Sequence, residues 1–212
     1  MTFNELKNRF KNYPLFKLED VFKYFPKAKR ETTLNQLNFW SKKGYLENIS
    51  RGIYKLSDFE IKDPFLLANF IYSPSYISLE SALNYYSIIP DIPFAITSVT
   101  INKTKKFKTK DYGVFYYSHL KPDLFFGFKS ILVEKKYSYN IALPEKALFD
   151  YLYLKGRKIE HPEGFIEELR LDLPKKFNWK IFKNWKKQIS KKNKLFHQLL
   201  EILIKKYNNY GK

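Results

Sequence analysis

Three side chains between residues 122 and 136 have the types and spacing of a metal-dependent nuclease site. A Pro-Asp pair ending at Asp123 is followed, after ten residues, by Glu134 and then by Lys136. In such a site two carboxylates hold Mg²⁺ and the lysine assists the water that attacks a phosphate. The pattern is short and the chain has 39 basic and 21 acidic residues, so chance matches are common. A magnesium-dependent, restriction-type nuclease is therefore the alternative, and the main prediction is that the chain is not an enzyme.

The remaining residues offer little for metal or covalent chemistry. His119, His161 and His197 fall in three different predicted elements, and the chain has no cysteine. Neither a zinc site nor a disulfide is therefore predicted. The seven glycines are spread singly and make no phosphate-binding loop. The sequence predicts no catalytic residue, no metal and no cofactor.

Residues 29–43 carry side chains that are suited to the recognition of DNA bases. If this segment is a helix, Leu34, Leu37 and Trp40 face inward and the side-chain amides face outward. Amides of Asn and Gln can pair with adenine in a major groove. The cations beside them suit phosphates. We expect the outward Phe39 to pack on a second domain. The predicted DNA contacts of this segment and the hairpin after it are Lys29, Arg30, Thr32, Asn35, Gln36, Lys42, Lys43 and Arg51.

The net charge of +18 is concentrated at the two ends of the chain. Residues 1–58 carry +6 and residues 175–212 carry +11, whereas the middle carries only +1. A codon bias toward lysine would spread this charge more evenly, so a polyanionic partner is the preferred explanation. A solvated lysine face that contacts nothing is the alternative for the C-terminal segment. The C-terminal residues predicted to form a second DNA-contact surface are Lys183, Lys186, Lys187 and Lys191.

The elements that would position the N-terminal residues follow a known plan. Thr2 and Glu5 suggest a capping box for a first helix, a second helix is predicted over 18–25, and the third ends at Gly44. Strands 45–49 and 53–56 then flank a tight turn. Three helices followed by a hairpin are typical of a winged helix-turn-helix domain, here residues 1–58, whose third helix enters the major groove. A helical bundle with an incidental hairpin is the alternative.

A polar break at residues 58–64 predicts a boundary before a mixed α+β domain, residues 62–212, of which 156–212 is a basic helical extension. The predicted helices are 65–72, 79–86, 144–154, 164–171, 179–189 and 195–207. The predicted strands are 95–102, 112–119, 124–128, 131–134 and 137–143, with a basic turn at 103–110. The lack of a membrane-spanning stretch, of a secretory signal and of cysteine predicts a cytoplasmic protein with no membrane partner.

Several short motifs occur in a fixed order along the chain. They are Gly-Tyr-Leu at 44–46, Arg-Gly-Ile-Tyr at 51–54, Ile-Ser-Leu-Glu-Ser-Ala-Leu at 77–83, Ile-Thr-Ser-Val-Thr at 96–100, Phe-Phe-Gly at 125–127 and Ile-Ala-Leu-Pro-Glu-Lys-Ala-Leu-Phe-Asp at 141–150. In this order they resemble the AbiE-type antitoxins of bacterial abortive-infection systems. The resemblance covers about residues 18–154, and residues 156–212 carry no matching motif.

The resemblance implies a type IV toxin–antitoxin system that acts in phage defence. The N-terminal domain is then expected to bind double-stranded operator DNA and repress its own operon. The second domain is expected to counteract a nucleotidyltransferase toxin encoded beside it without forming a stable complex. A stand-alone transcriptional regulator is one alternative. An RNA-binding protein that stacks bases on its 17 tyrosines and 20 phenylalanines is another.

The motif residues of the second domain are expected to serve structure more than catalysis. Ser78 is a good helix N-cap, with Glu80 and Ser81 in the first turn. A buried polar cluster is expected from four residues, namely Glu80, Glu145, Lys146 and Asp150.

Overall fold

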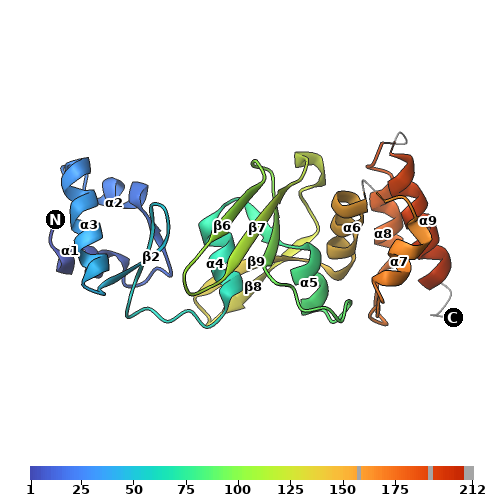
Figure 1. The fold of residues 1–212 in the computed structure, drawn as a ribbon, viewed down its shortest axis with the longest axis horizontal. Coiled ribbons are helices and arrows are strands. Elements are labelled where there is room, and N and C mark those ends of the chain that lie inside the picture. Colours follow the sequence, from blue (N-terminus) through green and yellow to red (C-terminus); the bar gives the residue numbers. More distant parts are fainter. Residues whose placement is uncertain (157–158, 191–192, 208–212) are drawn as a thin grey trace.

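The computed structural model describes residues 1–156, 159–190 and 193–207 and is a mixed α+β structure with two separate sheets. In Figure 1 the chain runs from a small unit at one end, through the larger of the two sheets in the middle, to a group of helices at the other end. We call these parts the N-terminal unit (residues 1–58), the sheet region (residues 62–155) and the C-terminal helices. Within the described residues, no helix is both long and apolar enough to cross a membrane.

The N-terminal unit contains three helices and a small antiparallel sheet with strand order β1-β3-β2. Its elements are α1 (Phe3–Phe10), β1 (Phe16–Lys17), α2 (Leu18–Tyr24), α3 (Arg30–Lys42), β2 (Leu46–Ser50) and β3 (Ile53–Leu56). The three predicted helices and the hairpin are confirmed. The two-residue strand β1 was not predicted, because it is too short to show the alternation of a strand.

Local sequence explains where these elements begin and end. Thr2 and Glu5 form the predicted capping box at the start of α1. Gly44 has φ +75° directly after α3, and Gly52 has φ +74° in the β2–β3 turn, a backbone region that glycine enters without a steric penalty. The core of the unit is built largely from aromatic and aliphatic residues such as Phe10 and Leu37.

The sheet region is a six-stranded sheet of order β6-β7-β5-β4-β9-β8. The β4–β9 and β5–β7 pairs are parallel, and the other neighbours are antiparallel. The strands are β4 (Ser75–Ile77), β5 (Ile96–Thr100), β6 (Lys105–Lys108), β7 (Val114–His119), β8 (Phe128–Val133) and β9 (Tyr137–Ala142).

Two predictions for this region are wrong, and one strand was missed. The predicted turn at 103–110 contains β6, an edge strand whose lysine side chains remain in water. Most of the predicted strand at 124–128 is instead the end of a 3-10 turn, Pro122–Leu124, followed by a loop in which Gly127 has φ +72°. The strand β4 has only three residues, all buried, so it has no polar–apolar alternation that would reveal it.

Helices cover both faces of the sheet. The helix α4 (Pro64–Ile71) contacts one face, where Tyr117 Oη donates a hydrogen bond to Ala68 O at 2.6 Å. Thr97 lies opposite Tyr116, so it points to the other face. There its hydroxyl accepts from the backbone N–H of Ser81 in α5 (Leu79–Tyr85). The helix α6 (Pro144–Lys155) lies beside α5 on this second face.

The C-terminal helices pack on α6 through aromatic and leucine side chains. They are α7 (Pro162–Glu168), α8 (Trp179–Lys186) and α9 (Lys194–Tyr207), as predicted to within a few residues. Phe149 of α6 contacts Phe182 of α8 and Phe196 of α9 edge-on, with ring centroids 6.2 and 5.2 Å apart. The apolar stripes of these helices therefore face a shared core.

Three apolar residues of the N-terminal unit belong to the core of the sheet region. Leu15, Ile49 and Ile53 are buried and pack in the larger of the two hydrophobic clusters. Polar contacts strengthen this join, since Tyr137 Oη donates to Asn12 O at 3.1 Å and Lys136 Nζ to Asn12 Oδ1 at 3.0 Å. The turn between β2 and β3 is consequently held in a defined place relative to the sheet.

We predict that Leu15→Ala lowers the free energy of unfolding of the whole chain by about 2–5 kcal/mol, because it leaves a cavity between the two parts. Equilibrium unfolding in urea measures this loss. The exposed neighbour Lys11→Ala serves as a control and should leave the midpoint unchanged. Equal midpoints for Leu15→Ala and the wild type would contradict the shared core.

Candidate nucleic-acid interface and buried polar cluster

The outer face of α3 carries polar and cationic side chains in water. Thr32, Asn35 and Lys43 are exposed, as predicted from helical spacing, and Lys42 at the end of the helix is exposed as well. The opposite face is buried through Thr33, Leu37 and Trp40. The two cations at the start of this segment, Lys29 and Arg30, are also exposed. The helix therefore presents a largely polar face, in which the exposed Phe39 is the apolar exception.

Gln36 differs from this prediction. Its side-chain amide donates a hydrogen bond to Met1 O at 2.9 Å and is half-buried. The amide is thus engaged by the N-terminus of the chain. Asn38, which was not among the predicted contacts, is exposed on α3 instead. Helical spacing alone could not reveal this exchange, because the contact joins residues 35 positions apart.

A groove of about 960 Å³ lies between the N-terminal unit and the sheet region, and we call it the basic groove. Its walls include Arg51 from the β2–β3 turn and Arg30 from the start of α3. Lys105, from the edge strand β6, brings a cation of the sheet region to the same groove. The cationic lining residues are Lys17, Lys23, Arg30, Arg51 and Lys105, and the acidic ones are Glu19 and Asp20.

The basic groove extends the positive surface beyond the predicted residues. Lys106 and Lys108 of β6 are exposed next to Lys105. The lysine-rich composition of residues 103–110 is the only sequence signal for this surface, and it does not distinguish a basic turn from the strand β6 that the structure has there. Because strand pairing places β6 at the sheet edge, Lys105 lines the basic groove beside the N-terminal unit, whereas Lys106 and Lys108 alternate to the other face of the strand.

The C-terminal lysines lie elsewhere. Figure 1 shows α8 and α9 at the end of the molecule opposite α3. Lys183 and Lys187 are exposed, whereas Lys186 pairs with Glu201 at 3.0 Å. Lys191 lies outside the described residues. The structure therefore does not bring this lysine set together with the α3 residues.

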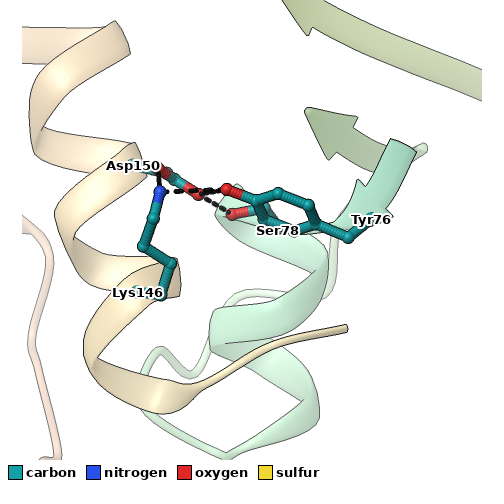
Figure 2. Close-up of polar contacts among 4 residues, drawn as sticks. All are labelled: Tyr76, Ser78, Lys146 and Asp150. Carbon is teal, nitrogen blue, oxygen red and sulfur yellow. Dashed lines mark hydrogen bonds and ion pairs between the residues drawn. The ribbon is translucent and has the colours of Figure 1, made fainter. Parts of the chain in front are cut away.

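A group of four hydrogen-bonded polar side chains, Tyr76, Ser78, Lys146 and Asp150, is buried inside the sheet region (Figure 2), and we call it the lysine–aspartate cluster. Asp150 accepts hydrogen bonds from Tyr76 Oη at 2.9 Å and from Ser78 Oγ at 2.8 Å. Lys146, one turn earlier on α6, pairs with Asp150 and donates to Tyr76 Oη at 2.9 Å. All four side chains are fully buried. The cluster joins α6 to the strand β4 and the residue that follows it.

Burial dominates the electrostatics of this cluster. It lowers the pKa of Lys146 from its ordinary value and raises the pKa of Asp150, while the attraction between the two groups opposes both shifts. Burial also raises the pKa of Tyr76 well above its ordinary value. The ammonium group of Lys146 lies 5.0 Å from the ring centroid of Phe126 and 5.5 Å from that of Phe149. These rings enclose the cation, so the cluster is suited to holding the fold and not to contacting a substrate.

The absence of a side chain at Gly127 leaves room for the side chain of Lys146. A Cβ atom added to Gly127 would lie 3.1 Å from side-chain carbons of Lys146, and φ at this position is +72°. The Phe-Phe-Gly motif therefore covers the lysine–aspartate cluster with backbone and with two aromatic rings, Phe125 against Tyr76 and Phe126 near Lys146.

The other motif residues take separate structural roles, which corrects the expected four-residue cluster. Glu80 pairs with Lys155 at 2.8 Å, and Glu145 accepts from the backbone N–H of Asn178 at 2.6 Å. Ser78 precedes α5, but its hydroxyl donates to Asp150 and does not cap the helix. Ser81 Oγ accepts from Thr97 N at 2.8 Å. Only Lys146 and Asp150 of the expected cluster meet.

The residues of the nuclease pattern are not assembled. Asp123 lies in the 3-10 turn before β8, and Glu134 follows the end of that strand, whose six residues span about 20 Å. Glu134 pairs with Lys62 at 2.9 Å, and Lys136 donates to Asn12. Across residues 1–156, 159–190 and 193–207, no group of three or more His, Asp or Glu residues is arranged to hold a metal ion.

We predict that Lys146→Met costs about 3–5 kcal/mol of unfolding free energy, because it leaves the Asp150 carboxyl buried without its partner. The double variant Lys146→Met/Asp150→Leu should recover much of this loss, since no charge then remains inside. Urea unfolding measures both. Lys155→Met removes the partly exposed ion pair between the same helix and Glu80 of α5 and should cost at most about 1 kcal/mol. A loss for Lys146→Met no larger than that of this control would contradict a buried ion pair.

The chain matches no protein-family model, and no curated protein sequence matches it.

Proposed function

We propose that the chain is a DNA-binding repressor of the AbiE antitoxin type, with a winged helix-turn-helix formed by its N-terminal unit. The supporting observation is the order of elements, α1, β1, α2 and α3 followed by the β2–β3 hairpin, with the three strands in one antiparallel sheet. In this plan α3 is the recognition helix and the β2–β3 turn is the wing. The exposed polar face of α3 and the cationic groove beside the wing support the same assignment.

The proposed binding mode divides the residues between bases and phosphates. Asn35 and Thr32 would face base edges in the major groove, where an asparagine amide can pair with adenine. Lys29, Lys42 and Lys43 would contact phosphates on either side of the helix. Arg51 at the wing tip would enter the adjacent minor groove or contact its backbone. The lysines of the basic groove would follow the phosphate backbone as it leaves the wing.

The proposed second activity is protection from a nucleotidyltransferase toxin, without a stable complex. It rests on the motif resemblance, and the lysine–aspartate cluster gives the motifs a physical role, since they hold α6 against β4. Co-expression with the neighbouring toxin gene tests this activity by cell survival. If the wild-type chain gives no protection from that toxin, the chain is a stand-alone regulator. The non-enzymatic assignment is supported by the separation of Asp123 from Glu134.

We predict that Asn35→Ala weakens binding to the region upstream of the chain's own gene by roughly 5- to 150-fold, which corresponds to one lost base contact of about 1–3 kcal/mol. Binding to a random duplex should change little. Gln198→Ala, an exposed amide on α9, is the matched control. Fluorescence anisotropy with both duplexes measures these affinities. A wild-type protein that binds the two duplexes equally would contradict sequence-specific repression.

We further predict that the triple variant Lys17→Gln, Lys23→Gln and Lys105→Gln reduces the slope of log affinity against log salt concentration. Each lost phosphate contact should change the slope by about 0.9. The double variant Lys183→Gln and Lys187→Gln also removes exposed lysines, at the other end of the molecule, and should leave the slope unchanged. A flatter slope only in this second variant would place the phosphate contacts on the C-terminal helices.

A further inference from the structure

Phe39 is an exception among the aromatic residues of the N-terminal unit. It leaves 55% of its surface exposed, the largest value of any aromatic residue in this unit. It belongs to neither hydrophobic cluster, so the expectation that it packs on the second domain is wrong. The ammonium of Lys43 lies 5.8 Å from the centroid of the Phe39 ring.

The other exposed aromatic residues of this unit have both a polar group and a packing partner. Tyr13 contacts Phe10, and Tyr45 contacts Phe3. Tyr24 lies under the guanidinium of Arg9, at 3.3 Å. Each of these tyrosines also keeps a hydroxyl that water can solvate. Phe39 has no hydroxyl, and within the N-terminal unit, which is described in full, no ring contact accompanies it.

The position of Phe39 relates it to the proposed base contacts. It lies four residues after Asn35 and seven after Thr32, so the three side chains form one stripe along α3. Lys42 and Lys43 follow directly at the end of the helix. An apolar ring therefore occupies the middle of a face that is otherwise built for a polyanion.

We infer that Phe39 determines specificity by contacting the 5-methyl group of thymine in the major groove. Thymine is the base that presents a methyl group there, beside the hydrogen-bonding edges that Asn35 would read. Contact between the Phe39 ring and the thymine methyl group removes apolar surface of both groups from water, which favours binding. The inference rests on the proposed function and adds the feature of the DNA that this residue recognises.

The test compares one duplex in two chemical forms. The region upstream of the chain's own gene is synthesised with thymine or with deoxyuridine, which lacks only the methyl group. Wild-type protein should bind the uracil form about fourfold more weakly for each methyl group contacted. Phe39→Ala should bind the thymine form more weakly than the wild type and show no further loss with uracil. Phe39→Leu, which keeps an apolar side chain, should retain part of the discrimination.

A control separates the methyl contact from general effects of uracil on the duplex. Asn35→Ala should remain as sensitive to uracil as the wild type, because its proposed contact is with adenine. Equal uracil sensitivity of Phe39→Ala and the wild type overturns the inference, as does indifference of the wild type to uracil. Since Phe39 is exposed, the circular dichroism of Phe39→Ala should match that of the wild type.

Two further outcomes can be distinguished from the uracil results described above. If wild-type protein prefers neither the upstream duplex nor a random one, the proposed function fails and the inference falls with it. If Phe39→Ala changes the sedimentation mass of the free protein, the ring is covered by a second copy of the chain, and the inference alone is overturned. An unchanged mass together with lost methyl discrimination supports it.

Discussion

The arrangement of the sheet region depends on the burial of one ion pair. Lys146 and Asp150 lie one turn apart on α6, and both are removed from water. Burial of unpaired charges is costly, so the side chains of Tyr76 and Ser78 must stay where they complete the pair's hydrogen bonds. Because Tyr76 belongs to a central strand, this requirement positions α6 on the sheet. Through Phe149, α6 in turn supports α8 and α9.

The same constraint gives the sequence motifs a physical meaning. The Pro-Glu-Lys-Ala-Leu-Phe-Asp string supplies the ion pair and the aromatic contact to the C-terminal helices, and the Phe-Phe-Gly string closes over the lysine. The Ser-Leu-Glu-Ser-Ala-Leu string supplies Ser78 to the pair and Ser81 to β5. These strings therefore describe how a domain is held together. The proposed antitoxin activity is not assigned to their side chains.

The N-terminal unit depends on the sheet region in a different way. It has its own core, but Leu15, Ile49 and Ile53 are shared with the larger one. This join holds the β2–β3 turn near the edge strand β6, and the basic groove is the result. Cationic residues from three segments of the sequence thereby line one groove. A long anionic ligand can meet this surface at several points, which is the setting of the proposed DNA contacts.

The sequence by itself determined the elements whose signals are local. The capping box at Thr2, the glycine after α3 and the apolar spacing of the long helices set those boundaries to within a few residues. It also placed Thr32 and Asn35 on the outer face of α3. Tertiary structure alone decided that β4 and β6 are strands, since their pairing partners lie more than five residues away. It likewise decided that Gln36 binds Met1 and that Lys105 lines the same groove as Arg51. It also decided that Glu80 and Glu145 take other partners, so that only Lys146 and Asp150 of the four motif residues meet. These outcomes depend on contacts between segments far apart in the chain, which no local pattern of residues encodes.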